Sequence, residues 1–154
     1  YVGDGNNMCH SLLNLAGCLG MRMVVCTPKG YGPDAGILAS ASRLATHNGG
    51  QIRLVAEPLS AVKGASFVYT DVWASMGQEA EAEERRKVFR PFQVNAELLA
   101  AAPAHQKILH CLPAHRGEEI TADVFESERA IVFDQAENRL HAQKAILERL
   151  ISGA

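Results

Sequence analysis

The chain has 154 residues, a length that fits one domain with a sizeable buried core. Hydrophobic residues make up 47% of it and charged residues 21%, as in ordinary globular proteins. The formal net charge of −2 gives no reason to expect nucleic acid or a membrane surface as a partner, and no apolar run approaches the ~18 residues that span a bilayer.

Strand-like and helix-like segments alternate along the chain. In chain order we expect a strand near Tyr1–Gly3, a helix over Met8–Leu19, a strand at Met23–Cys26, a helix over Pro33–Thr46 and a strand at Ile52–Ala56. There follow a helical turn at Pro58–Val62, a strand at Phe67–Thr70, a charged helix over Gln78–Phe89 and a short helix at Ala96–Ala102. The last elements are strands near Ile108–Cys111 and Ala130–Phe133 and a helix over Ala136–Ile151.

This alternation predicts the fold class. Strands that alternate with helices form right-handed βαβ units and a parallel sheet. Several of the strands are continuous apolar runs, as required where both faces of a sheet are covered. We therefore predict an α/β fold with a three-layer, doubly wound parallel β-sheet of the Rossmann-like type, with helices on both faces.

The charged segment before Phe89 has a simpler interpretation. Acidic residues are followed by basic ones, and Glu81 and Arg85 stand at i,i+4 spacing. We expect a solvated helix there.

Polar and reactive residues follow the predicted strands, at the edge where open parallel sheets bind ligands. The first strand is followed by Asp4–Asn7, the fourth by Asp71 and the fifth by His110–Pro113. Because these segments converge on one edge, the sequence predicts a binding site there. A carboxylate at a strand end, as at Asp71, suits a cationic small molecule.

Several of these residues have two interpretations. One of Asn6 and Asn7 can cap the helix that begins there, or its amide can reach a carboxylate ligand. Cys111 is either a buried thiol or a polar contact and proton acceptor at the sheet edge. Arg139 falls in the first turns of the predicted last helix, where it either pairs with Glu137 or Asp134 or grips a phosphate or carboxylate.

The four cysteines predict neither a metal site nor a disulfide scaffold. None belongs to a Cys-x-x-Cys pair, and His10 and His110 each stand beside a single cysteine. Reduced thiols and a cytoplasmic protein without metal or cofactor are expected.

Two other functional classes stay open as alternatives. Gly3-Asp4-Gly5 supplies two glycines of a dinucleotide fingerprint, but the third position is Met8 and Thr27-Pro28 stands where an acidic residue is expected. A nicotinamide-dependent dehydrogenase domain is therefore the weaker alternative. The other is a non-catalytic module that binds an amino acid.

Five motifs follow one another along the chain. They are Gly3-Asp4-Gly5-Asn6-Asn7, Thr27-Pro28-Lys29-Gly30-Tyr31, Asp71-Val72-Trp73-Ala74-Ser75-Met76-Gly77-Gln78-Glu79, His110-Cys111-Leu112-Pro113 and Ala136-Glu137-Asn138-Arg139. Together these motifs resemble the ornithine-binding half of an ornithine carbamoyltransferase, and they cover the chain from end to end in the family's order. The Ser-Met-Gly loop and Cys111 distinguish ornithine enzymes from their relatives, since aspartate enzymes carry Pro at the cysteine and putrescine enzymes lack the loop.

The resemblance implies a role for each site residue. Asn7 and the backbone of Met76 would hold the α-carboxylate of L-ornithine, and Asp71 and Ser75 its α-ammonium. Cys111 would help to deprotonate the side-chain amine that attacks carbamoyl phosphate, giving L-citrulline and phosphate.

The carbamoyl phosphate contacts implied by the resemblance are Cys111, Leu112 and Arg139, with Arg139 stabilising charge on the transferred group. Asp71, Cys111 and Arg139 would therefore be the catalytic residues. No cofactor is implied.

The resemblance also implies that part of the enzyme is absent from this sequence. The family has an N-terminal domain with Ser-Thr-Arg-Thr and His-Pro-x-Gln segments that bind carbamoyl phosphate, and neither occurs here. We expect residues 1–154 to be the C-terminal, ornithine-binding domain of a longer enzyme, inactive alone. The parent enzyme is expected to be a homo-oligomer, a trimer or a multiple of one, through contacts mostly in the missing half.

Overall fold

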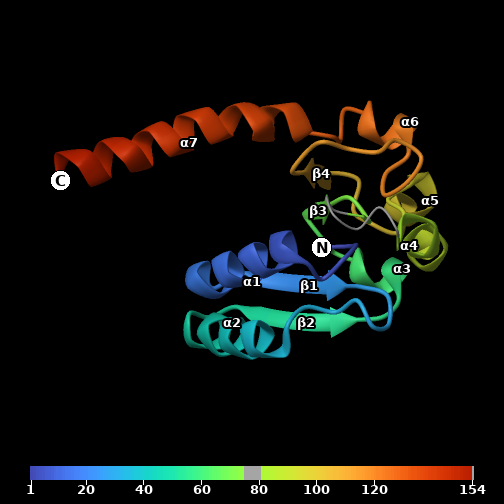
Figure 1. Cartoon of the computed structure of the whole chain (residues 1–154), viewed down its shortest axis with the longest axis horizontal. Coiled ribbons are helices and arrows are strands. Elements are labelled where there is room, and N and C mark those ends of the chain that lie inside the picture. The colour runs from blue at the N-terminus through green and yellow to red at the C-terminus, as the bar shows by residue number, and fades with distance from the viewer. Residues whose placement is uncertain (75–80, 154) are drawn as a thin grey trace.

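The computed structural model describes residues 1–74 and 81–153. Its elements in chain order are α1 (Asn7–Leu19), β1 (Arg22–Cys26), α2 (Ala35–His47), β2 (Gln51–Val55), α3 (Pro58–Ala61), β3 (Phe67–Thr70), α4 (Ala82–Phe89), the 3-10 helix η2 (Arg90–Phe92), α5 (Ala96–Ala100), β4 (Lys107–His110), α6 (Ala122–Phe125) and α7 (Val132–Ser152) (Figure 1).

The strands form a parallel sheet with the first segment of the chain in its middle. β1 pairs with β2 and β3 pairs with β4, both in parallel. Val2 joins the two pairs, because it bridges Cys26 in parallel and its N–H donates to the Tyr69 carbonyl at 2.9 Å. Ala130 forms a parallel bridge to Ile108 at the far side of β4. The order across the sheet is therefore β2, β1, Val2, β3, β4 and Ala130.

Helices lie on both faces of this sheet, so the predicted α/β, doubly wound class is confirmed. α1 and α2 pack against each other and against β1 and β2, while α3 to α6 gather at the other end of the molecule (Figure 1). Such a sheet places the carboxyl ends of its strands on one edge, where the segments that follow Val2, β3 and β4 come together.

Local sequence explains where the first helices begin and end. The side chain of Asn6 caps α1 by accepting from the Met8 N–H at 3.1 Å. α1 ends at Gly20, whose φ of 62° lies in the left-handed region that favours glycine. Asp34 caps α2 in the same way, accepting from the Ile37 N–H at 2.9 Å. Of the two asparagines that the sequence offers as caps, Asn6 is therefore the one used.

The end of the chain differs from the prediction. Instead of a strand over Ala130–Phe133, only Ala130 pairs with the sheet, and α7 begins at Val132. Short apolar runs do not distinguish a strand from the buried first turn of a helix. Arg139 consequently lies beyond the first turn of α7, where the helix dipole no longer matters. The interpretation of Arg139 as a helix-start residue is wrong. The short helix α6 was not predicted at all.

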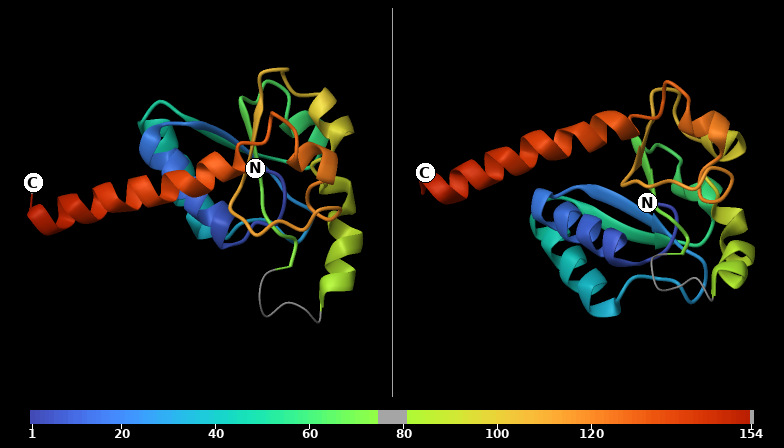
Figure 2. Two further views of the ribbon diagram at one scale, coloured as in Figure 1. Left: turned by 90° about the horizontal axis from the view of Figure 1, so that it is seen from above. Right: turned by 45° about the horizontal axis from the view of Figure 1, so that its top comes forward.

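α7 extends away from the body of the molecule (Figure 2). Val132 is its one buried residue, whereas Phe133, Leu140, Leu147 and Ile151 are exposed large hydrophobic residues along it. Within residues 1–74 and 81–153, no helix combines the length and the apolar character needed to cross a membrane.

Candidate active site

Asp71 and Cys111 meet at the carboxyl edge of the sheet. β3 and β4 pair with Thr70 opposite His110. Asp71 and Cys111, which follow these two residues, therefore lie side by side. The Cys111 thiol donates to Asp71 Oδ1 at 2.9 Å, and the Val72 N–H donates to the same oxygen at 2.8 Å. Asp71 is only 5% exposed. The structure thus joins two predicted site residues in one contact.

The loop after Val2, which forms a single bridge instead of the predicted strand over Tyr1–Gly3, brings its asparagines to the same place. Asn6 Nδ2 donates to Asp71 Oδ2 at 3.4 Å, while its Oδ1 remains the cap of α1. Asn7 follows with an exposed side chain on the first turn of α1, and its carbonyl accepts from Ser11 Oγ at 3.0 Å. Asn7 therefore lies on the exposed side of α1, directly after the residue that contacts Asp71.

The protonation state of Cys111 follows from its surroundings. Burial, then the hydrogen bond and the charge of Asp71, raise the pKa of the thiol from 9.0 to about 12, against a smaller opposing effect of the Tyr69 hydroxyl. Burial likewise raises the pKa of Tyr69 to about 12, and its hydroxyl accepts from Gln135 Nε2 at 3.0 Å. Near neutral pH Cys111 is therefore a neutral donor to the Asp71 carboxylate.

His110 and Glu119 support the loop after β4. Both side chains are fully buried, with His110 Nε2 at 3.0 Å from Glu119 Oε1. The Leu112 N–H donates to His110 Nδ1 at 2.8 Å, so Nδ1 is the acceptor and Nε2 carries the hydrogen that Glu119 accepts. The His115 N–H donates to the same Glu119 oxygen at 2.6 Å. These bonds fix the path of the chain on both sides of Cys111.

The backbone at Leu112 is unusual. Its φ of 58° lies in the left-handed region, and the Leu112–Pro113 peptide is cis. A positive φ costs a non-glycine residue about 1–2 kcal/mol, and such conformations cluster at functional sites. The N–H of Leu112 is occupied by His110, so a ligand at this residue would meet its carbonyl or its side chain.

An open groove of about 670 Å³ runs between this loop and α7. Its lining includes Cys111, Leu112, Pro113 and Arg139. Arg139 is exposed, and the neighbouring Glu137 pairs with His141 at 3.6 Å. The three residues predicted to contact carbamoyl phosphate therefore share one groove, next to Asp71.

The predicted site residues Ser75 and Met76 lie outside the described residues. Their roles stay predictions.

Arg85 departs from its prediction as a solvated residue. Its contact with Glu81 is present at 3.9 Å, but the Arg85 side chain is only 5% exposed and forms a buried ion pair with Asp4. Burial raises the pKa of Asp4, and the charge and hydrogen bond of Arg85 oppose that shift. The i,i+4 pattern did not reveal this partner because Asp4 is far away in the sequence.

A metal would find few free donors beside Cys111. Donor atoms of Asp71, His110 and Cys111 lie within 4.8 Å of one another. However, both ring nitrogens of His110 are already hydrogen bonded, to Leu112 and to Glu119. This group therefore offers an ion only the carboxylate and the thiol.

The glycine-rich loop is packed by protein. A Cβ on Gly5 would lie 2.3 Å from Pro33 N and 2.6 Å from the Tyr31 carbonyl oxygen, which accepts the Gly5 N–H at 2.8 Å. In a dinucleotide site the second glycine instead lets the pyrophosphate approach the backbone. The dehydrogenase alternative thus loses its remaining support.

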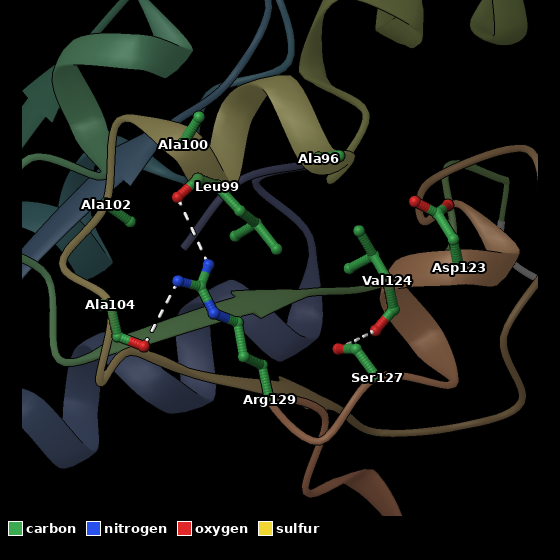
Figure 3. A pocket seen from close by; sticks show the side chains of 9 residues that line it. All are labelled: Ala96, Leu99, Ala100, Ala102, Ala104, Asp123, Val124, Ser127 and Arg129. Carbon is green, nitrogen blue, oxygen red and sulfur yellow. Dashed lines mark hydrogen bonds between the residues drawn. The ribbon is translucent and has the colours of Figure 1, made fainter.

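A second hollow, of about 430 Å³, lies between α5, α6 and Arg129 (Figure 3). Alanine and leucine side chains form much of its wall, and the Arg129 guanidinium is directed to the Leu99 and Ala104 carbonyls at 3.4 and 3.3 Å. It includes none of the predicted site residues.

Comparisons with known proteins agree with the sequence motifs. A profile of the family described as aspartate/ornithine carbamoyltransferase, Asp/Orn binding domain, matches residues 1–150. The ornithine carbamoyltransferase of Pyrococcus horikoshii is 58% identical over 153 residues, covering 99% of this chain and 48% of that protein.

Solved structures give the same result. The ornithine carbamoyltransferase of Pyrococcus furiosus superposes with a TM-score of 0.91 at 58% identity, over 96% of this chain and 47% of that one. The anabolic enzyme of Campylobacter jejuni gives a TM-score of 0.93 at 37% identity, over 99% and 50%. The chain thus spans about half the length of the relatives it matches.

Proposed function

Because the chain belongs to the aspartate/ornithine carbamoyltransferase family, we propose that it is the ornithine-binding half of an enzyme that carbamoylates L-ornithine. The observation that carries the proposal is the contact between Asp71 and Cys111, beside Asn6 and the Arg139 groove. A carboxylate, a thiol and a guanidinium are the groups needed to bind an ammonium, remove a proton and stabilise an acyl phosphate.

Ornithine recognition is assigned to the end of β3, at Asp71. Asp71 has no cationic side chain within salt-bridge distance among residues 1–74 and 81–153, so its charge is available to the α-ammonium of ornithine. Asn7, which is exposed, is assigned the α-carboxylate together with Met76, and Ser75 shares the α-ammonium with Asp71. A carboxylate for the ammonium and amide donors for the carboxylate together select an amino acid over a simple amine.

Proton removal is assigned to Cys111. An amine attacks only when neutral, so the side-chain ammonium of ornithine must lose one proton. A cation beside Asp71 offsets the carboxylate charge, which is one cause of the high Cys111 pKa. The small fraction of Cys111 that has lost its proton to solvent is the thiolate that accepts the proton from ornithine.

Carbamoyl transfer is assigned to the groove that Cys111 shares with Leu112 and Arg139. The neutral amine forms a bond to the carbamoyl carbon, the bond from that carbon to the phosphate oxygen breaks, and the departing phosphate takes the second proton that the attacking nitrogen must lose. The Arg139 guanidinium stabilises the charge that develops on the oxygens. Positioning of the two substrates supplies much of the rate.

We further propose that a carbamoyl-phosphate domain in the rest of the enzyme completes the site, so residues 1–154 alone are inactive. Two observations support this division: the relatives are about twice as long, and the large hydrophobic residues of α7 are exposed. A homo-oligomeric parent enzyme, a trimer or a multiple of one, and a cytoplasmic location remain predictions.

Calorimetric titration with L-ornithine tests the assignment of Asp71. Loss of a buried charge partner costs at least about 2 kcal/mol, so Asp71→Asn should weaken binding about 30-fold or more. Asp123→Asn is the matched control, because it removes an exposed carboxylate on α6, in the second hollow. Equal affinities of wild type and Asp71→Asn would refute the assignment. NADH binding at micromolar concentration would favour a dehydrogenase instead.

A further inference from the structure

Arg85 holds two segments of the candidate site together. Its NH2 group donates to the carboxylate of Asp4, in the loop between Val2 and α1. Its Nε donates to the carbonyl of Trp73 at 2.5 Å, in the segment after β3. Asp4 lies two residues before Asn6, and Trp73 lies two residues after Asp71. One guanidinium therefore connects the loop that carries the asparagines with the segment that carries the site carboxylate.

The guanidinium itself is held in place by aromatic rings. Its carbon lies 4.9 Å from the ring centre of Tyr31 and 5.2 Å from that of Phe89. Tyr31 and Phe89 are in edge contact, with ring centres 4.8 Å apart, and Trp73 lies 6.1 Å from Phe89. A planar group fixed between rings presents its N–H donors in one orientation, which a lysine ammonium does not do.

The ion pair also compensates the charge of one of two neighbouring carboxylates. Burial and, to a lesser degree, the charge of Asp71 raise the pKa of Asp4, and both carboxylates are buried. Arg85 compensates Asp4, whereas no cationic side chain of residues 1–74 and 81–153 pairs with Asp71. A buried ion pair is a weak source of stability, because desolvation offsets much of the attraction. Its geometry therefore points to a role in arranging the site.

We propose that Arg85 is a positioning residue for the ornithine site, which fixes Asp71 and its contact with Cys111 relative to the Asn6–Asn7 loop through Trp73 and Asp4. The identification of the ligand as ornithine rests on the proposed function. The effect of Arg85 on the Asp71–Cys111 contact does not depend on it.

The test compares Arg85→Met and Arg85→Lys with Arg86→Met. Arg86 is on the same helix, is 52% exposed and pairs with Glu118 at 2.9 Å, so it controls for the loss of one cation from α4. Arg85→Lys keeps the buried positive charge but loses the planar set of guanidinium N–H donors. It replaces Arg85→Met in the comparison if that variant does not fold. Each variant is measured by ornithine calorimetry and by iodoacetamide alkylation as a function of pH, with each cysteine resolved by mass spectrometry.

We expect both Arg85 variants to bind ornithine about tenfold or more weakly, because the displaced Asp71 carboxylate no longer meets the ammonium in good geometry. We also expect Cys111 to be alkylated faster at pH 8, because a loosened contact with Asp71 lowers its pKa. Arg86→Met should match wild type in both measurements.

The buried thiols Cys9 and Cys26 separate positioning from stability. General loosening of the fold would accelerate alkylation of Cys9 and Cys26 together with Cys111, whereas loss of positioning accelerates Cys111 alone. Uniform acceleration, or wild-type affinity together with a wild-type Cys111 profile, would overturn the proposal. Failure of the wild-type chain to bind ornithine would refute the proposed function, while the Cys111 profile would still decide the role of Arg85.

Discussion

Replacement of Asp71 by asparagine should lower the pKa of Cys111. The asparagine side chain would keep the shape of the carboxylate and an oxygen that accepts from the Val72 N–H, but it would remove the negative charge 2.9 Å from the Cys111 sulfur. A like charge at this distance disfavours the thiolate, so its removal makes deprotonation easier. Besides burial, the Asp71 charge also raises the pKa of Asp4 and of Tyr69, so these groups should shift in the same direction, while the burial of Cys111 is unchanged.

The structure sets the size of this effect. The pKa of Cys111 is raised from 9.0 to about 12, burial is the largest cause, and the hydrogen bond and charge of Asp71 account for the next two. Burial persists in the variant. We therefore expect the pKa to fall by about one unit, which is about 1.4 kcal/mol and a tenfold larger thiolate fraction at any pH well below the pKa.

Alkylation by iodoacetamide measures this fraction, because only the thiolate reacts. Rates for each cysteine, resolved by mass spectrometry between pH 7 and 10, give a profile for wild type and for Asp71→Asn. Cys111 should react about tenfold faster in the variant, with no change at the exposed Cys18. An unchanged or slower Cys111 would refute the coupling between the carboxylate and the thiol.

Further predictions concern stability and are measured by urea denaturation. Ile108→Ala empties a fully buried site in β4 and should lower the free energy of unfolding by about 2–5 kcal/mol, whereas Leu15→Ala at an exposed position should change it by less than about 0.5 kcal/mol. Equal effects would contradict the assigned core. Burial raises the pKa of Cys26 from 9.0 to about 11, so the folded state retains this proton longer than the unfolded state. Stability should therefore fall as pH rises from 9 to 11, by up to about 1.4 kcal/mol per pH unit for this thiol, and Cys26→Ala should show a smaller slope; an identical slope would count against the assignment. Glu119→Ala should cost at least about 1–3 kcal/mol, because the buried Nε2–H of His110 loses its acceptor; a stability equal to wild type would show that this hydrogen bond is dispensable.

The sequence was sufficient for much of the fold and for the centre of the site. Regular alternation of apolar runs and helical patterns predicted the parallel sheet, and residues at strand ends predicted that Asp71 and Cys111 would meet. Both follow from local periodicity and from a general property of parallel sheets. The start of α7 was predicted wrongly because Val132 belongs to an apolar run that suits either a strand or a buried helix turn.

The supporting contacts were not predictable in this way. Arg85 pairs with Asp4 across a sequence separation of 81 residues, so its own segment showed only a charged helix. His110 and Glu119 are separated by 9 residues, across an irregular loop for which no periodic pattern applies. The available signal for Arg85 was a charged residue on the face of α4 that packs against the protein core. Charged residues are rarely fully buried unless they are paired.

The most direct test of the central claim is a transfer assay with a hybrid enzyme. The chain replaces the matching half of the Pyrococcus furiosus ornithine carbamoyltransferase, whose structure it resembles at a TM-score of 0.91. Citrulline is then measured with carbamoyl phosphate and ornithine, and carbamoylated products with aspartate or putrescine in its place. We predict citrulline from ornithine, little product from the other two amines, and a large loss of rate with Asp71→Asn. A folded hybrid that binds ornithine and carbamoyl phosphate without forming citrulline, or that carbamoylates aspartate instead, would contradict the account.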